Sequence, residues 1–293
     1  MNKYAGVVVL YNPEEEVVKN IESYLPCIER LYVLDNSEEI NNQIYEQLNN
    51  NSKIEYVNLM GNKGLAYALN VGCHMAISED FDYVLTMDQD SLFMDGAVKN
   101  IIQFIENTTE RYTIIAANAV SIYNDEVTQD KKIAYTELND SNEECNWVMT
   151  SGSMMSLKDY SNTNGFDEEM FIAHIDIDLC IQFFNNGCKI IKLANAKLYQ
   201  QFGNSKPRKI LWKTVHPSYA NAVRTYYLFR NQKYLEMKYG KTIRKFIGVK
   251  LSKFIIKITL FEDEKFAKYK MMIQGLLDAR NGKMGKYLEN QKE

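Results

Sequence analysis

Two acidic pairs in this sequence have the residue types and spacing to do chemistry. Asp88 and Asp90 are separated by Gln89 and directly follow the apolar run at residues 83–87. Two carboxylates at this spacing can hold a hard divalent cation that keeps open positions for diphosphate oxygens. The alternative is a solvated turn, because Asp is common where strands end.

Asp176 and Asp178 form the second pair, at the start of a segment with a helical pattern. One of them could be a general base that takes a proton from an acceptor hydroxyl. The alternative is a helix cap, because a carboxylate at a helix start is stabilised by free N–H groups and by the helix dipole. Asp35 ends another apolar run, where it could accept a hydrogen bond from a pyrimidine N3–H or simply form an Asx-turn.

Other catalytic signatures are missing from the sequence. The chain has three His and five Cys without paired zinc-ligand spacing. It contains neither a GxSxG nucleophile elbow nor a GxxxxGK[ST] phosphate loop. The candidate chemistry therefore rests on carboxylates.

Strand-like and helix-like segments alternate through the first half of the chain. Apolar runs at 6–11, 31–34 and 83–87 predict strands, and the spacing at 14–26 and 64–76 predicts helices. This order is typical of an α/β fold with a mostly parallel sheet, in which ligands bind beyond the carboxyl ends of the strands. Asp35 and the Asp88/Asp90 pair both fall at such ends. The acidic segment at 124–146 is interpreted as a loop or mobile flap.

Composition narrows the class of protein. The 293 residues are 46% hydrophobic and 25% charged, which excludes a disordered or collagen-like chain. The net charge of −4 argues against a dedicated nucleic-acid binder, so we expect no nucleic-acid partner. The first apolar run is too short for a signal peptide, and no stretch has the apolar length to span a bilayer. These features predict a reduced, cytoplasmic protein.

Eight segments taken together resemble glycosyltransferase family 2, and in particular its bacterial rhamnosyltransferase-like branch. The resemblance covers residues 5 to about 232, and its strength lies in the order of motifs that are individually weak. The segments are 7–13 (VVVLYNP), 33–37 (VLDNS), 62–72 (NKGLAYALNVG), 87–91 (MDQDS), 151–153 (SGS), 165–167 (GFD, leading into Phe171-Ile172), 175–180 (IDIDLC) and 224–231 (RTYYLFRN).

The resemblance implies a GT-A fold, an inverting mechanism and roles for matching residues. The implied catalytic domain is 1–215, with a Rossmann-like, mostly parallel sheet flanked by helices, and 216–293 is a C-terminal helical extension. Asp176 matches the general base, and Asp88 and Asp90 match the DxD motif that binds Mg²⁺ or Mn²⁺. The implied donor-binding residues are Tyr11, Asn12, Asp35, Asn62, Gly64, Ala66 and Asp88, with phosphate favoured at the helix N-terminus after Gly64. The implied acceptor side comprises Ser151, Gly152, Asp178, Arg224 and Arg230.

Two positions depart from the family pattern. Ile175 stands where an acidic residue usually precedes the base, and Gln200 stands where many members carry a His. The third metal ligand is therefore in doubt, and an amide oxygen predicts metal use that tolerates Mg²⁺. These departures keep open a catalytically degenerate nucleotide-sugar-binding assembly subunit. A nucleotidyltransferase is disfavoured, because the segment after the first strand is acidic rather than Gly-rich and basic.

The resemblance also implies the partners. The donor is a nucleoside diphosphate sugar, with dTDP-L-rhamnose as first choice and a UDP-hexose as second. The acceptor is a glycan or lipid-linked glycan in cell-surface polysaccharide synthesis.

Residues 241–258 carry six basic residues, no acidic residue and an apolar helical face. This pattern predicts either a helix on the anionic inner face of the plasma membrane or one packed on the catalytic domain.

Overall fold

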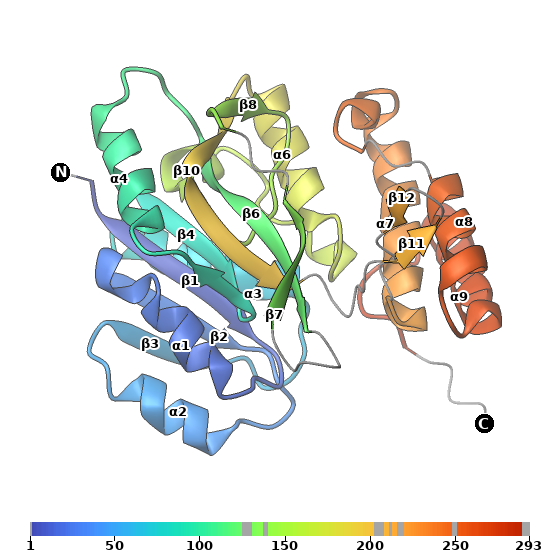
Figure 1. Cartoon of the computed structure of the whole chain (residues 1–293), viewed down its shortest axis with the longest axis horizontal. Coiled ribbons are helices and arrows are strands. Elements are labelled where there is room, and N and C mark those ends of the chain that lie inside the picture. The colour runs from blue at the N-terminus through green and yellow to red at the C-terminus, as the bar shows by residue number, and fades with distance from the viewer. Residues whose placement is uncertain are drawn as a thin grey trace.

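A curled sheet flanked by helices forms the centre of the molecule (Figure 1). The computed structural model describes residues 2–124, 131–136, 140–201, 208–210, 213–215, 220–247 and 251–288. Within them, the strands of the main sheet lie in the order β3-β2-β1-β4-β9-β6-β10-β5, with β7 on β6 and β8 on β10. The α/β class predicted from the sequence is confirmed.

One half of the sheet is parallel and the other is mixed. Strands β3, β2, β1 and β4 pair in parallel, because a helix connects each to the next along the chain. Beyond β4, only the β6–β10 pair is parallel, so the predicted mostly parallel sheet holds for the first half. The strands are β1 Tyr4–Leu10, β2 Arg30–Asp35, β3 Ile54–Asn58, β4 Tyr83–Asp88, β5 Ser91–Phe93, β6 Ile114–Asn124, β7 Lys131–Thr136, β8 Glu143–Cys145, β9 Ser153–Ser156 and β10 Ile190–Gln201, and a separate hairpin joins β11 Arg208–Ile210 to β12 Lys213–Val215.

Helices cover both faces of the sheet. The side chains of Val7 and Val8 point to opposite faces, and each joins a different buried cluster. Helices α3 and α6 pack on the Val7 face, and α1, α2 and α4 pack on the Val8 face. The helices are α1 Glu16–Glu22, α2 Asn42–Asn49, α3 Leu65–Ser78, α4 Ala97–Asn107, α5 Leu157–Tyr160, α6 Ile175–Asn185, α7 Ala222–Tyr239, α8 Leu251–Phe261 and α9 Lys265–Arg280.

The acidic segment at 124–146 differs from the predicted loop. Strand β7 pairs with β6 and strand β8 pairs with β10, so this segment extends the sheet. Strand β8 depends on a partner far along the chain, and β7 returns along the preceding strand β6; a local polar pattern reveals neither pairing. Residues 125–130 and 137–139 lie outside the described part of the chain.

The C-terminal helices α7, α8 and α9 lie together beside the sheet, as Figure 1 shows. Leu235 of α7 is fully buried in the same apolar cluster as Ile175 and Ile177 of α6. The helical extension is therefore present and shares a core with the sheet domain. The division into two domains at residue 215 stays a prediction.

The segment 241–258 is not the continuous helix that the sequence predicts. A short 3-10 turn spans Thr242–Lys245, and α8 begins at Leu251, with residues 248–250 outside the described part. Ile243 and Phe246 are buried, and the Phe246 ring meets the Phe184 ring of α6. Tertiary packing of these two side chains thus removes part of the predicted apolar face.

Gly275 lets α9 approach the backbone of α7. A Cβ at this position would lie 2.6 Å from the Tyr226 carbonyl oxygen and 3.1 Å from the Arg230 amide nitrogen. We expect Gly275→Val to lower the free energy of unfolding by about 2–3 kcal/mol, because the two backbones must separate. Thermal or denaturant unfolding measures the effect. The control is Ala267→Val at an exposed position of α9, where a change below about 0.7 kcal/mol is expected; equal losses in the two variants would contradict the close-packing explanation.

Candidate active site

The Asp88–Asp90 turn joins β4 to β5, and hydrogen bonds from the segment before β9 hold it in place. The amide nitrogen of Asp88 donates to Ser151 Oγ at 3.1 Å, and Ser151 Oγ donates to Ser91 Oγ at 2.8 Å. Gly152 donates its N–H to the Thr86 carbonyl at 2.9 Å. Ser151 is buried, and it and Gly152 hold the acidic turn in place. Their predicted place on the acceptor side stays a prediction.

The carboxylate of Asp88 lies among other charged groups. Burial, with Asp90 and Asp176 nearby, raises its pKa to about 7, and the Arg224 guanidinium opposes this rise. Gln200 Nε2 donates to Asp88 Oδ2 at 2.9 Å. Because β10 pairs with β5, the register sets Gln200 opposite Ser91. The fold therefore brings together four predicted site residues from β4, β10, α6 and α7.

The donor set at this turn suits a hard cation. Asp88 and Asp90 offer carboxylate oxygens, and the buried Gln200 Oε1 has no hydrogen-bond partner within the described part of the chain. Mg²⁺ and Mn²⁺ accept carboxylate and amide oxygens. No group of three or more His, Cys, Asp or Glu in the described residues could hold a metal ion. Any cation here would thus depend on two carboxylates, one amide and ligand oxygens.

Asp176 sits in the first turn of α6, whose N-cap residue is His174. Asp176 Oδ1 accepts the adjacent Ile177 N–H at 2.9 Å, and burial raises the pKa of the carboxyl to about 6. The side chain of His174 makes no cap hydrogen bond, so Asp176 supplies the carboxylate contact at this helix start, and this contact leaves its second oxygen for chemistry. A partly buried carboxylate with a raised pKa can accept a proton near neutral pH.

The raised pKa predicts the pH dependence of catalysis. Asp176 must be ionised to act as a base, so we expect the transfer rate to fall about tenfold per pH unit well below pH 6. If Asp176 had the ordinary pKa of about 3.9, the enzyme would keep nearly full activity at pH 5. The measurement is kcat at saturating donor and Mg²⁺ between pH 4.5 and 8, with activity recovered at pH 7.5 as the control for unfolding. A flat profile down to pH 5 would contradict this assignment.

The loop after β1 is tied to the acidic turn by Gln89. Its side chain accepts the Tyr11 N–H at 2.8 Å and donates to the Tyr11 carbonyl at 3.1 Å. Asn12 has a φ of 46° and donates its N–H to Ser37 Oγ at 2.8 Å. Both Tyr11 and Asn12 are exposed, which suits a ligand surface. Gln89 was missed as a positioning residue, although its place between the two aspartates is a signal for it.

Asp35 does not face open solvent. Its side chain is fully buried, Oδ1 accepts the Ser37 N–H at 2.9 Å and Oδ2 accepts the Tyr56 hydroxyl. These bonds shape the loop after β2, and contact of Asp35 with a nucleotide base stays a prediction. Tyr56 was not predicted as its partner, because it lies on another strand.

The N-terminus of α3 is already occupied by backbone. The Phe171 carbonyl accepts the Leu65 N–H at 2.7 Å and the Ala66 N–H at 3.4 Å. Gly64, with a φ of 98°, permits this approach, since a Cβ there would lie 2.9 Å from the same oxygen. These two N–H groups therefore have an acceptor within the chain, and phosphate binding at this helix end stays a prediction. Leu65 and Ala66 hold the loop before α6, and the half-buried Asn62 accepts from Asn36 Nδ2 at 3.2 Å and from the Gly64 N–H at 3.1 Å.

Two more residues predicted on the acceptor side are fully buried. Asp178 accepts hydrogen bonds from the Lys238 ammonium and the Tyr239 hydroxyl, each at 2.9 Å. Arg230 donates to backbone carbonyls, including Met170 at 2.9 Å. Both join α7 to neighbouring segments, and their predicted contact with an acceptor stays a prediction. Arg224, also predicted on the acceptor side, is exposed and lies close enough to Asp88 to lower the pKa of that carboxyl.

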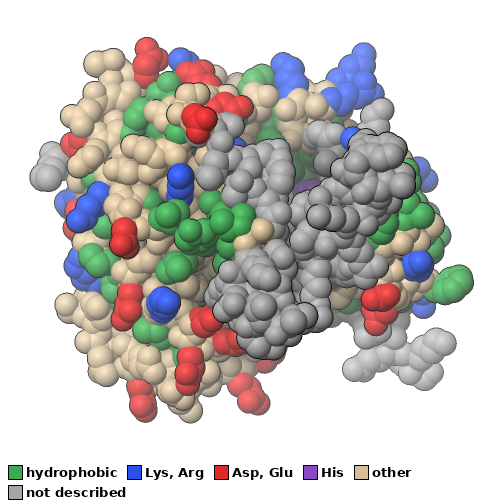
Figure 2. All heavy atoms as spheres, in the orientation of Figure 1, with side chains coloured by type: hydrophobic (Ala, Val, Ile, Leu, Met, Phe, Trp, Pro, Cys, Tyr) green, Lys and Arg blue, Asp and Glu red, His purple; other side chains and the backbone are tan. Residues whose placement is uncertain are grey.

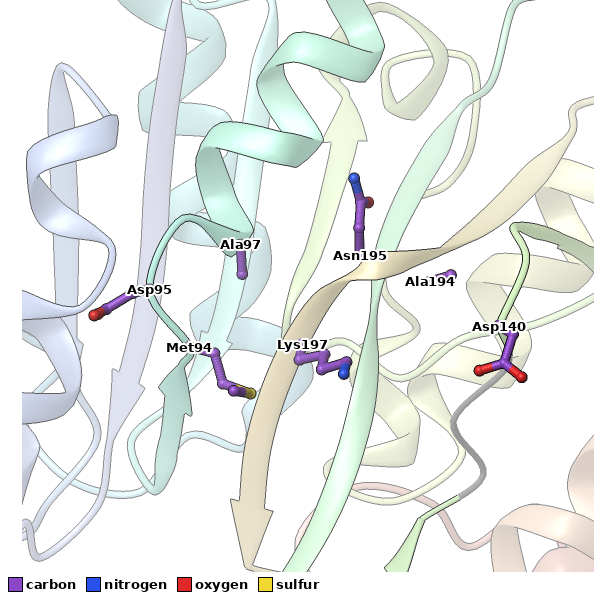
Figure 3. A pocket seen from close by; sticks show the side chains of 7 residues that line it. All are labelled: Met94, Asp95, Ala97, Asp140, Ala194, Asn195 and Lys197. Atoms are coloured by element: carbon purple, nitrogen blue, oxygen red, sulfur yellow. The ribbon is translucent and has the colours of Figure 1, made fainter.

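A cavity of about 410 Å³ lies away from these residues (Figure 3). Its side chains come from the β5–α4 connection, from β10 and from the segment before β8. None of the residues predicted to bind donor, metal or acceptor lines it. The candidate active site is instead the carboxyl edge of β1 and β4.

The fold and the acidic site at the sheet edge define a GT-A glycosyltransferase. The family model for glycosyl transferase family 2 matches residues 7–166, which is more than half of the chain, and the protein belongs to this family. A curated relative, the dTDP-rhamnosyl transferase RfbF of Shigella flexneri, is 25% identical over 242 residues, or 78% of each chain.

Solved structures share the fold at low sequence identity. TarS 1–349 of S. aureus in complex with UDP-GlcNAc superposes with a TM-score of 0.56 at 14% identity, covering 98% of this chain and 93% of that structure. GalNAc-T7 with UDP, GalNAc and Mn²⁺ gives a TM-score of 0.60 at 8% identity. That match covers 96% of this chain, which spans 56% of the GalNAc-T7 structure.

Proposed function

We propose that this glycosyltransferase transfers a sugar, with inversion, from a nucleoside diphosphate donor to a hydroxyl of a glycan acceptor. The convergence of Asp88, Asp90, Asp176 and Arg224 at the sheet edge carries the proposal. In the reaction, the acceptor oxygen bonds to the anomeric carbon as the bond to the diphosphate breaks. Attack from the face opposite the leaving group inverts the anomeric centre.

Asp176 would take the proton of the attacking hydroxyl. Its raised pKa makes the carboxylate a stronger base than an exposed Asp, while leaving it ionised at neutral pH. Arg224 would contribute positive charge beside the departing diphosphate, because it is exposed and close enough to Asp88 to lower the pKa of that carboxyl. Tyr11 and Asn12 would hold the nucleoside.

A divalent cation, Mg²⁺ or Mn²⁺, would bind at Asp88 and Asp90 with support from Gln200. When bound, such a cation neutralises charge that develops on the diphosphate. An amide ligand in place of imidazole favours tolerance of Mg²⁺.

The proposed donor is dTDP-L-rhamnose, with a UDP-hexose second. The named activity of the Shigella flexneri relative supports the first, and the UDP-sugar complex of TarS supports the second. The test is a thermal-shift panel of nucleoside diphosphate sugars with and without Mg²⁺, because a ligand of the native state raises the melting temperature. A Mg²⁺-dependent shift with one donor, followed by transfer to a glycan or lipid-linked glycan, is expected; no shift with any donor would contradict the proposal.

A degenerate nucleotide-sugar-binding subunit is the alternative. The Gln200 amide donates to Asp88, so this carboxylate has a partner without any cation. Such a subunit would bind a donor but would neither transfer nor hydrolyse it. Donor binding with no turnover under any metal condition would favour this alternative.

We also propose that the C-terminal region contacts an anionic membrane surface. Lys241, Arg244 and Lys245 are exposed on the turn after α7, where basic side chains gather at the upper right of Figure 2. On α8, Ile256 and Leu260 are exposed at 54% and 60%. No described helix has the length and apolar character needed to cross a bilayer. Surface contact, combining basic and apolar side chains, is therefore the form of membrane association proposed.

Flotation with vesicles tests this proposal. We expect the protein to float with phosphatidylglycerol-containing vesicles but not with neutral phosphatidylcholine vesicles. Replacing the three basic residues of the turn with Glu should weaken binding by at least about 10²-fold, at about 1 kcal/mol for each positive charge removed. The control replaces the exposed Lys19, Lys99 and Lys158 with Glu. Equal losses in the two triple variants would contradict the proposed surface.

A further inference from the structure

The turn that precedes Asp176 is held by two neighbouring residues of α7. Asn231 Nδ2 lies 2.9 Å from the Met170 carbonyl oxygen, 2.7 Å from that of Ile172 and 2.9 Å from that of Ala173. Its two amide protons are thus shared among three acceptors. Asn231 is fully buried, and its Oδ1 accepts the Arg230 Nε–H at 2.9 Å.

Arg230 extends the same support. Its guanidinium donates to the carbonyls of Glu169 at 3.2 Å and Met170 at 2.9 Å. It also donates to the Gly285 carbonyl at 2.6 Å, and Gly285 donates its N–H back to Glu169 at 2.7 Å. The segment at Gly285 is therefore hydrogen-bonded both to Arg230 and to the start of this turn. Such a set of buried bonds to backbone carbonyls leaves the turn little freedom.

The turn itself has an unfavourable backbone. Phe171, Ala173 and His174 have φ values of 62°, 67° and 61°, and none of them is glycine. Residues in such regions cost about 1–3 kcal/mol each and persist only where surrounding contacts hold them. Only Ile175 separates His174 from Asp176, and the turn sets where α6 begins. Backbone strain of this kind clusters at functional sites, so this turn is a candidate for a functional role.

We infer that Asn231 is a positioning residue for the proposed base, Asp176, acting by holding residues 170–174 in their strained conformation. This inference rests on the proposed function, because it gives the strain a catalytic purpose. Asn231 would not touch donor or acceptor. Loss of its amide would remove this donor from the Ile172 and Ala173 carbonyls while Arg230 still holds Met170, and would thereby relax the turn and shift the start of α6.

The experiment combines kinetics with hydrogen exchange on the full-length chain. We expect Asn231→Ala to lower kcat by about 10²-fold, since a displacement near 1 Å can cost that much. Donor dissociation constants, measured calorimetrically, should stay within about threefold, because Tyr11, Asn12 and the Asp88–Asp90 turn lie on other elements and Arg224 lies two turns before Asn231 on α7. Amides of residues 168–178 should lose exchange protection. The control is Gln232→Ala, the next buried residue of α7, whose side chain donates to Glu236 within the helix.

Each outcome decides the inference. A lowered kcat with loss of protection confined to 168–178 supports it, and unchanged kcat and protection overturn it. Equal effects in Gln232→Ala would reduce Asn231 to a general packing role and overturn it as well. If Asn231→Ala does not fold, Arg230→Lys replaces it, with a smaller loss expected in the same segment. If the wild-type chain transfers no sugar, the proposed function fails, while hydrogen exchange still decides whether Asn231 holds the turn.

Discussion

Asp176→Asn is expected to lower the rate of sugar transfer by about 10²–10⁴-fold, because the variant has no base for the acceptor hydroxyl. The amide keeps an oxygen that can accept the Ile177 N–H, so the start of α6 should be preserved. Donor binding should remain within about threefold of wild type, because the tyrosine and asparagine of the β1 loop are unchanged. The measurement pairs single-turnover transfer with calorimetric donor binding.

A matched change separates this effect from loss of charge in general. Glu169→Gln makes the same carboxylate-to-amide replacement at an exposed position seven residues earlier, and it should retain wild-type transfer. Transfer by Asp176→Asn at the wild-type rate would remove Asp176 as the base. Loss of both transfer and donor binding would instead assign Asp176 to the donor site.

Asp90→Ala is expected to lower kcat/KM by about 10²–10³-fold, because a bound cation contributes several kcal/mol of charge stabilisation and each 1.36 kcal/mol is tenfold in rate. Asp90 is exposed in the turn between β4 and β5, so the fold should tolerate the substitution. Asp88 is buried deeper, with Gln200 Nε2 at 2.9 Å, and its substitution would also disturb packing. The readout is kcat/KM for sugar transfer, together with donor affinity measured with and without Mg²⁺.

The expected pattern is specific to a metal-linked role. Wild-type protein should bind donor more tightly with Mg²⁺ than with EDTA, and Asp90→Ala should show the weaker affinity in both conditions. Asp95→Ala, an exposed acid on the following turn, should behave like wild type. Full wild-type transfer in excess EDTA would contradict metal dependence, whatever the variant does.

A common physical origin connects these two predictions. Asp88, Asp90 and Asp176 carry like charges at one edge of the sheet, and burial of two of them raises their pKa values to about 7 and 6. A positive ligand stabilises the ionised form of such carboxyls, as the Arg224 guanidinium already does by opposing the rise in the pKa of Asp88. The same group of carboxyls can therefore bind a cation, at Asp88 and Asp90, and supply a proton acceptor, Asp176.

The amino-acid sequence alone determined the fold class and the positions of the candidate acidic residues along the chain. Apolar runs ending in Asp35 and Asp88 predicted strands, and the strand–helix alternation predicted their parallel pairing, which the structure confirms for β1 to β4. These features are local, since strand and helix periods are read within a few turns of the chain. Family membership followed from motifs in their order along the sequence and is confirmed.

Only the tertiary structure decided which residues present a side chain and which hold the site in place. Asp35 is engaged by Tyr56 from a neighbouring strand, and the α3 N-terminus is filled by the Phe171 carbonyl. Asn231 reaches three carbonyls about sixty residues away in sequence. Such roles come from long-range packing, which depends on every element at once and leaves no local period in the sequence to read.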